Sequence, residues 1–392
     1  MVDGIMKKVP KDVIVAIILK FPMKSLVRFK CISQNCKAII QSSTFINQHH
    51  NRLTTATDEL ILFKRSIKQD TNQYKTILSF LSSDDCNQFN PIFPDLDATY
   101  LNSNYSSDYD QLMGPCHGLI ALMNFSSTIL VNPSTQNYRL LPPSPFNCPR
   151  GFYRSIESVG FGFDSIAKDY KIVTILHVYF EGPSGYPEEI TKKVEVYELE
   201  NDCWRELDRV NQQLPSLFWL PCSQIYFRGS CHWIAIPEVD PLVILSFDMS
   251  KEIFQTMKMP QTCYFIGGPT YSLVILNEFL TLICYRYQQP AIDQTKDLID
   301  IWIMNDYGVC ESWSKEYTVA GLPIESPLSI WNDYLLLFQS KSGSLMSYNL
   351  NSNEVKELNL HGFPGTLRVI VYKESLISIP RGSEVSTQVE KF

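Results

Sequence analysis

The hydrophobic pattern changes once along the chain, from a helical period in the first fifty residues to strand-like alternation in most of the rest. An apolar stripe at helical spacing runs from Val13 to Phe21. Pro10 suits its first turn, and Pro22 ends it. Ser25 can cap a second short helix.

Two more short helices are predicted, one around Cys36 and Ile39 and one from Phe45 to Leu53. So few short helices cannot bury all their apolar side chains against one another. Either the rest of the chain or a partner protein must cover the remainder, and the pattern leaves both alternatives open.

A strand, a polar turn and a return strand recur through the rest of the chain. The copies lie at residues 129–142, 194–207, 244–254, 299–313 and 345–358, with a fainter copy at 60–80. Further strands are expected at Gly118–Asn124, Val159–Phe163, Lys171–Val178, Gly229–Ile236, Leu273–Tyr285 and Tyr334–Gln339. This interval is typical of a four-stranded propeller blade, about 40–50 residues.

The expected fold class is therefore α+β, with an all-α N-terminal unit followed by an all-β, kelch-like propeller of about six blades. A large irregular β-sandwich is the alternative. The expected divisions are a helical domain at 1–50, a linker at 51–59, the β domain at 60–380 and a flexible tail at 381–392.

Charge is unevenly divided between these parts. Residues 1–50 hold eight Lys or Arg and two Asp, a net of +6, whereas the remainder holds 26 basic and 39 acidic residues, a net of −13. The two parts are suited to partners of opposite sign, and the alternative is that the acidic surface only aids solubility. Nucleic-acid binding is disfavoured because the β domain would repel phosphate.

The sequence offers no catalytic, cofactor or metal-binding pattern. The eleven cysteines include no CxxC pair. Cys231 and His232 are neighbours in a strand and must point to opposite faces, which prevents a direct nucleophile–base pair. Gly160-Phe-Gly-Phe lacks the third glycine of a dinucleotide loop. We therefore expect no enzymatic activity, no cofactor and no metal.

The compartment is expected to be reducing, because most cysteines lie in apolar strand-like runs. Lys7 and Lys8 before an apolar run are reminiscent of a secretion signal. However, Asp12 interrupts the junction and Lys20 follows the run directly. We expect neither secretion nor a membrane span.

The N-terminal segment resembles the plant F-box. The resemblance rests on Val9-Pro10-x-Asp12, on the run from Pro22 to Phe29, Pro-x-Lys-Ser-Leu-x-Arg-Phe, and on Ser43-x-Phe45. Val9 replaces the usual Leu, and Cys36 replaces the usual Trp, which puts the packing of the third helix in question. The resemblance implies docking onto a Skp-type adaptor that links to cullin and RING subunits. The implied contact residues are Val9, Pro10, Ile14, Leu19, Pro22, Leu26 and Val27.

The β domain resembles the plant F-box-associated domain at residues 114–122, 132–145, 160–164 and 196–207. Residues 148–154, 298–304, 323–328 and 369–375 more narrowly resemble pollen S-locus F-box proteins of the nightshade family. That resemblance implies a substrate-recognition subunit of an SCF-type ubiquitin ligase in the pollen tube cytosol. It would recruit non-self S-RNases, the style's secreted ribonucleases, for ubiquitination in self-incompatibility. An F-box receptor of another plant pathway and a propeller enzyme are the alternatives.

Polar insertions between repeats are the expected substrate-recognition loops, because Tyr beside acidic residues suits contacts with Lys or Arg. The insertions at 101–111 and 181–193 come first, ahead of 208–215 and 288–297. The candidate residues are Tyr105, Asp108, Tyr109, Asp110, Tyr186, Glu188 and Glu189.

Overall fold

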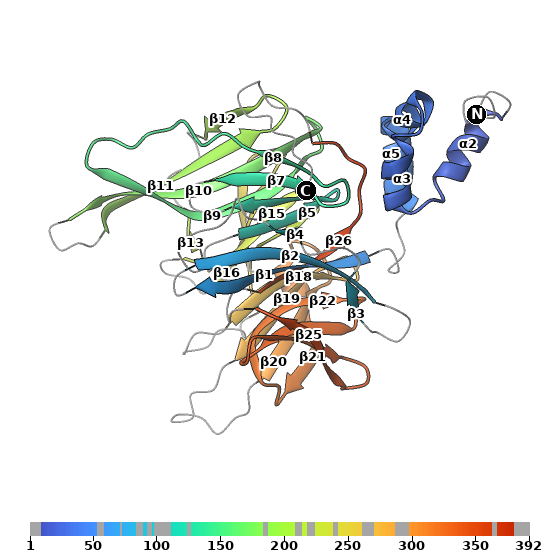
Figure 1. Cartoon of the computed structure of the whole chain (residues 1–392). Coiled ribbons are helices and arrows are strands. Elements are labelled where there is room, and N and C mark those ends of the chain that lie inside the picture. Colours follow the sequence, from blue (N-terminus) through green and yellow to red (C-terminus); the bar gives the residue numbers. More distant parts are fainter. Residues whose placement is uncertain are drawn as a thin grey trace.

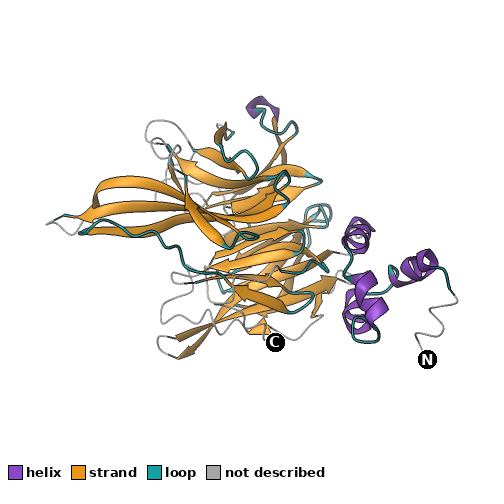
Figure 2. Ribbon diagram, turned by 90° about the horizontal axis from the view of Figure 1, so that it is seen from above, coloured by secondary structure: helices purple, strands orange, loops and turns teal. Residues whose placement is uncertain are grey.

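The alternating segments of the sequence form six antiparallel sheets, arranged as the blades of a propeller, and a group of short helices lies beside them (Figures 1 and 2). This computed structural model describes residues 9–52, 59–70, 73–83, 89–91, 96–97, 111–123, 127–182, 187–207, 214–217, 224–237, 242–260, 270–286, 298–362 and 367–379. The expected number of blades is confirmed, and the β-sandwich alternative is wrong.

Each blade pairs consecutive strands, with one exception described below. The first blade contains β26 (Arg368–Lys373), β1 (Glu59–Asp70), β2 (Gln73–Ser83) and β3 (Phe89–Pro91), with β4 (Leu96–Asp97) also on β2. The second contains β5 (Gln111–Cys116), β6 (Leu119–Met123), β7 (Thr128–Asn132) and β8 (Asn137–Leu140). The third contains β9 (Phe152–Asp164), β10 (Asp169–Glu181), β11 (Pro187–Glu198) and β12 (Cys203–Glu206).

The other three blades follow the same order. The fourth contains β13 (Ser216–Leu217) and β14 (Gln224–Phe227), which both pair with β15 (Ser230–Ile236), and then β16 (Val243–Asp248) and β17 (Phe254–Lys258). The fifth contains β18 (Thr270–Leu276), β19 (Phe279–Arg286), β20 (Leu298–Met304) and β21 (Trp313–Ala320). The sixth contains β22 (Ile324–Trp331), β23 (Leu335–Ser340), β24 (Ser344–Asn349) and β25 (Val355–His361), and a 3₁₀ turn (Cys310–Ser312) precedes β21.

The exception is the first blade, which takes a strand from the other end of the chain. β26 pairs antiparallel with β1, so that Leu60 lies opposite Tyr372 and Phe63 opposite Val369. β26 also contacts β22 of the sixth blade on one side and β5 of the second blade on the other. One strand thus completes the first blade and closes the ring.

The five clear sequence repeats are the third and fourth strands of blades two to six. The fainter copy at 60–80 is β1 and β2, which are the second and third strands of their blade because β26 takes the first place. Several repeat turns share one device. Asn132 Oδ1 accepts hydrogen bonds from the backbone N–H groups of residues 134 and 135, and Asp248 and Asn349 do the same for the residues that follow them.

One strand prediction is wrong. Residues 273–285, expected as a single strand, are parts of β18 and β19, joined by a two-residue turn at Asn277 and Glu278. Both turn residues have positive φ, +50° and +63°. Hairpin turns of this kind usually carry Gly at the second position, and a glutamate gives no such signal in the sequence.

The hydrophobic core lies between neighbouring blades. Trp233 of β15 is 1% exposed, and its indole donates to the Val159 carbonyl of β9 at 3.1 Å. A Cβ on Gly160 would lie 2.7 Å from the Trp233 ring. The glycine of the Gly160-Phe-Gly-Phe motif therefore allows two blades to approach closely, and it serves packing instead of binding a nucleotide.

The N-terminal helices are α2 (Lys11–Ile18), α3 (Met23–Phe29), α4 (Gln34–Ile40) and α5 (Ser43–Arg52). Ser25 lies inside α3 and does not cap it, because Pro22 takes the N-cap position and the helix starts one residue later. Ser33 caps α4, accepting from the Cys36 N–H at 3.2 Å. Cys36 is fully buried, so the missing Trp does not leave this helix unpacked. The linker expected at 51–59 is shorter, because α5 continues to Arg52 and β1 begins at Glu59; residues 53–58 and the tail at 381–392 lie outside the described residues.

Candidate protein-interaction site

The four helices form a small helical unit with its own core. Ile18, Met23, Leu26, Ile40 and Phe45 are buried together. Phe21 and Phe29 stack at its edge with ring centroids 5.1 Å apart. The unit is not enclosed by the sheets, and α2 lies on the side away from them (Figures 1 and 2). Within the described residues, Val13, Ile17 and Ile32 stay 45–50% exposed, so the propeller leaves part of the apolar surface of the helical unit uncovered.

The segment after β26, residues 374–379, connects the helical unit to the propeller. Leu376 is 2% exposed and belongs to the helical core. The Asn132 amide of β7 donates to the carbonyls of Ser375 at 3.0 Å and Ile377 at 2.7 Å. We call these six residues the strap, because they pack on both the second blade and the helices.

Two histidines meet at the same junction. The rings of His50 in α5 and His117 in the β5–β6 turn are 5.7 Å apart, edge to face. Burial lowers the pKa of both imidazoles, and Lys373 adds to the effect on His50. Both rings are therefore neutral near pH 7, and the junction buries no net imidazolium charge.

The outer face of α2 exposes apolar side chains. Val13 is 45% exposed and Ile17 is 50% exposed, and their i, i+4 spacing places them on one side of the helix. Ile32, after α3, is 47% exposed. Single exposed apolar residues are ordinary, but two on one helical face next to a pocket indicate a surface that another molecule covers.

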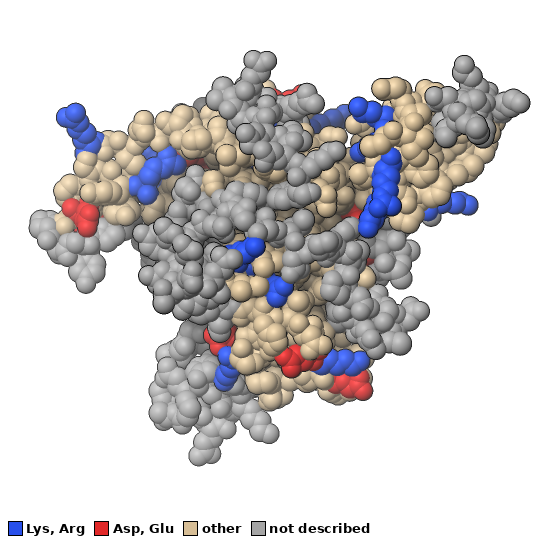
Figure 3. Space-filling model, in the orientation of Figure 1, with Lys and Arg blue, Asp and Glu red and all other residues tan. Residues whose placement is uncertain are grey.

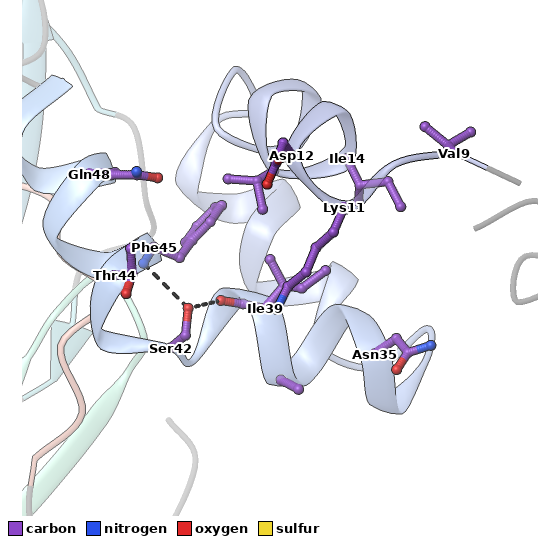
Figure 4. Close-up of a pocket in the computed structure, with 12 residues that line it drawn as sticks. Val9, Lys11, Asp12, Ile14, Asn35, Ile39, Ser42, Thr44, Phe45 and Gln48 are labelled. Carbon is purple, nitrogen blue, oxygen red and sulfur yellow. Dashed lines mark hydrogen bonds between the residues drawn. The ribbon is translucent and has the colours of Figure 1, made fainter. Parts of the chain in front are cut away.

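A pocket of about 600 Å³ opens beside α2. Figure 4 shows Val9, Lys11 and Ile14 on one side of it, with Ile39 of α4 and Phe45 of α5 on the other. Ser42 fixes the α4–α5 corner, since its hydroxyl donates to the Ile39 carbonyl at 2.7 Å and accepts from the Phe45 N–H at 3.3 Å. The lining combines apolar side chains from α2, α4 and α5 with polar groups such as Asn35 and Gln48, which suits a partner that offers an apolar side chain flanked by polar groups.

Basic side chains lie around this apolar surface (Figure 3). Lys11, Lys20, Lys24, Arg28 and Lys37 are exposed, whereas Asp12 is the acidic residue among 9–52. The surface therefore favours an acidic partner.

The seven predicted adaptor contacts lie in different environments in the structure. Val9 and Ile14 line the pocket, and Pro10 and Pro22 are exposed. Leu19 and Val27 are half-buried against the helical core. Leu26 is 0% exposed, so this residue packs inside the unit and does not offer its side chain to a partner as predicted.

Val13 and Ile17 were missed as contacts although they belong to the recognised apolar stripe. The signal lies in the run from Val13 to Ile18, which is apolar at every position. Such a run covers the whole circumference of a helix, which is more than one packed face needs.

The predicted substrate-recognition residues are mostly outside the described residues. This applies to Tyr105, Asp108, Tyr109, Asp110 and Tyr186. Glu188 is exposed near the start of β11, and Glu189 lies in the same strand. Their role remains a prediction.

The candidate nucleophile and base in the β domain, Cys231 and His232, are both buried in the structure. His232 is fully buried, with Nε2 2.7 Å from the Tyr307 hydroxyl, and burial lowers its pKa to about 4. Burial also raises the pKa of the Cys231 thiol. Within the described ranges, no three His, Cys, Asp or Glu side chains gather closely enough for a metal ion. No helix in those ranges has the length and apolar character needed to cross a membrane.

Comparisons with known proteins point to one group. Residues 69–379 match the family model of the F-box associated beta propeller domain. The F-box protein CPR1 of Arabidopsis thaliana is 25% identical over 395 residues, covering 95% of this chain and 89% of its own. An F-box/kelch-repeat protein of the same plant is 25% identical over 379 residues, covering 94% and 95%. Among solved structures, TolB from Acinetobacter baumannii reaches a TM-score of 0.43 at 10% identity over 83% of this chain and 70% of its own, too weak a likeness to bear on function.

Proposed function

The chain belongs to the F-box associated β-propeller family, and on that premise we propose that it is the substrate receptor of an SCF-type ubiquitin ligase. Its relatives are named F-box proteins, which is compatible with a non-catalytic role. In this role the helical unit binds a Skp-type adaptor with its cullin and RING subunits. The propeller holds the protein to be ubiquitinated, and the transfer chemistry belongs to the partners.

The exposed apolar face of α2 is the observation that carries this proposal. Val13 and Ile17 are about half exposed on α2, which lies on the side of the helical unit away from the propeller, and Val9 and Ile14 line the pocket beside this helix. Val13 and Ile17 are already about half buried, so covering the exposed halves of both contributes about 1.5–3 kcal/mol to binding. The basic rim adds attraction to an acidic adaptor.

Substituting Val13→Asp and Ile17→Asp together should weaken binding of a purified Skp-type adaptor at least about 100-fold. Each substitution would bury an unpaired carboxylate in the contact. The measurement is titration calorimetry with the full chain. Both sites are exposed, so the thermal unfolding midpoint should stay within about 3 °C of the original.

A matched control is Ile166→Asp with Val355→Asp, which changes the same residue types at 75% and 44% exposure on the propeller. The control should bind the adaptor normally. Equal affinity of the α2 variant and the control would show that α2 is not the contact, and the ligase assignment would fail with it.

For the substrate, we propose S-RNases in the pollen tube cytosol, recruited for ubiquitination in self-incompatibility. Support comes from the resemblance of residues 148–154, 298–304 and 369–375 to pollen S-locus F-box proteins. The net charge of −13 on residues 51–392 adds support, because secreted ribonucleases of this kind are generally basic. A receptor in another plant pathway is the second candidate, since the relatives are named F-box and F-box/kelch-repeat proteins of Arabidopsis thaliana.

The purified chain with its adaptor should bind a subset of purified S-RNase variants, with an affinity that falls steeply as salt is raised from 50 to about 300 mM. Surface plasmon resonance gives both the selectivity and the salt slope. Transcript confined to pollen separates this pathway from another. Binding to none of the variants, together with expression in leaf and root, would leave the second candidate.

A further inference from the structure

Among the strands that the structure describes, the two longest, β9 and β10, belong to the third blade and project with β11 as an arm. Its strands β9, β10 and β11 are 13, 13 and 12 residues long, and their distal halves extend past the rest of the propeller (Figure 1). We define the arm as residues 150–156, 176–182 and 187–193. β12 pairs with β11 only at Glu195–Glu198, so it covers none of the arm.

Aromatic side chains occupy two neighbouring rungs of the arm. Tyr153 lies opposite Tyr179 with ring centroids 6.0 Å apart, and Phe152 lies opposite Phe180 at 5.9 Å. Neighbouring rungs point to opposite faces of a sheet, so each face carries one aromatic pair. Tyr153 is 53% exposed and Phe180 is 39% exposed. Blade packing does not use these exposed rings, which makes them available to another molecule.

Acidic groups border the aromatic pairs. Glu188 lies directly across from Phe180, and Glu181 follows it; both carboxylates are exposed. The Glu188 carboxylate folds over Gly182, where an added Cβ would come within 2.1 Å of it. Arg150 is the exposed cation at this end of the described arm. The rings and carboxylates together favour a cationic ligand, because Lys and Arg can stack on the rings and pair with the acids.

The base of the arm is held in place by ion pairs that occupy its own cations. Arg154 pairs with Glu195 at 3.0 Å and donates to the Phe146 carbonyl at 2.5 Å. Glu157 pairs with Lys192 at 3.2 Å, and its other carboxylate oxygen lies 3.0 Å from His177 Nε2. These contacts fix the strands in position, so the rings at the tip are presented on a rigid support that loses little entropy on binding.

We propose that the end of the arm is a docking site for a folded basic protein that contacts both of its faces. Tyr153 and Glu181 engage Lys or Arg side chains of that protein on one face, and Phe180 and Glu188 do so on the other. This inference rests on the proposed function, since such a protein would be the substrate of the receptor. Charge complementarity selects this occupant over a nucleic acid, whose phosphates the carboxylates would repel.

The test compares two arm variants of the full chain in complex with its adaptor. One is Tyr153→Thr with Phe180→Thr, and the other is Glu181→Gln with Glu188→Gln. The probes are purified S-RNase variants and the basic protein ribonuclease A, measured by surface plasmon resonance. The aromatic variant should weaken binding at least about tenfold through faster dissociation. The charge variant should lower the association rate and flatten its salt dependence.

The matched control is Glu354→Gln with Glu357→Gln, two exposed acids at β25 of the sixth blade. It removes the same charge from the molecule and should leave binding and its salt dependence close to the original. If the arm variants and this control bind alike, or if neither probe binds the original complex, the arm proposal is overturned. If the aromatic variant unfolds at a lower temperature than the original, the association rate of the charge variant still tests the proposal.

Failure of the proposed substrate is a separate result. Ribonuclease A binding that depends on the arm, with no S-RNase bound, would support the arm while rejecting that substrate. The oligomeric state of the complex, measured by sedimentation without either probe, tests whether a second copy of this chain occupies the arm. A dimer that the arm variants dissociate would identify a second copy of this chain as the occupant, and it would overturn a basic partner.

Discussion

A chain that ends at residue 366, lacking β26 and the strap, should lose cooperative unfolding altogether. Leu367, Val369 and Tyr372 are 0%, 3% and 1% exposed, and burying them contributes roughly 5–9 kcal/mol together. A whole domain is stable by only about 5–15 kcal/mol. The Tyr372 hydroxyl also lies 2.6 Å from Ser134 Oγ and donates to the Gly118 carbonyl at 3.2 Å, so the second blade loses contacts too.

Circular dichroism on heating, with near-ultraviolet signal as the measure of packing, checks this result. Two longer chains are the controls. One ending at Ile379 keeps β26 and the strap and should melt as the original does. One ending at Lys373 keeps the closed ring but lacks Leu376, so it should retain the propeller transition and lose packing of the helical unit. A chain ending at 366 with the original melting curve would show that closure by β26 does not stabilise the ring.

Lys171→Met should destabilise the propeller by about 3–5 kcal/mol, because it leaves buried carboxylates without their cation. Lys171 Nζ lies 2.6 Å from Asp164 Oδ2 and 2.7 Å from Glu252 Oε1, and its side chain is 6% exposed. Glu252 also pairs with Arg205, which pairs in turn with Glu198 at 2.8 Å. This network joins the third blade to the β16–β17 turn of the fourth blade.

The same network makes stability depend on pH. Burial of Asp164 alone would raise its pKa, but hydrogen bonds from Lys171 and from the backbone N–H groups of residues 166 and 167 lower it to about 2. A carboxyl whose pKa is depressed by folding stabilises the fold at pH values above its unfolded pKa. That contribution should disappear as the pH falls from about 4 to 2, and the Lys171→Met variant should show a smaller loss over this range.

The free energy of unfolding in urea, measured at pH 7 and at pH 3 for the original protein and the Lys171→Met variant, gives both the loss of stability and its pH dependence. Lys251→Met is the matched control. The Lys251 side chain is 68% exposed, and its Nζ lies 3.5 Å from Asp248 Oδ2 at the surface of the protein. This substitution should change stability by no more than about 0.5 kcal/mol. Equal destabilisation by the two substitutions would mean that the buried network contributes nothing beyond a surface pair.

The blades could be predicted because each consists of neighbouring strands with alternating side chains. Sequence patterns that span fewer than about 50 residues predicted the five repeats, their polar turns and the number of blades. The pairing of β26 with β1 could not be predicted in this way. The two strands lie some 300 residues apart, and neither carries a local sequence signal for the other. The turn at Asn277 and Glu278 was missed because both residues have positive φ although neither of them is a glycine.

The candidate sites were predictable to different degrees. Helical spacing identified α2 as apolar, yet spacing alone could not separate Leu26, which faces inward, from Ile17, which faces outward. That difference depends on how four helices pack in space. The aromatic arm was only partly anticipated through Glu188, because Tyr153 meets Tyr179, and Phe152 meets Phe180, only through the β9–β10 register.

Ring closure by β26 also sets an order for biosynthesis. While the ribosome makes this protein, β1 is released early and must wait for residues 368–373 before its blade can be completed. Until then the nascent chain exposes an unpaired strand edge, a hazard for misassembly in crowded polysomes. The strap emerges near the end of synthesis, so the helical core gains Leu376 only after almost all of the propeller has been made. The core of the helical unit is therefore completed only when nearly the whole polypeptide has been made.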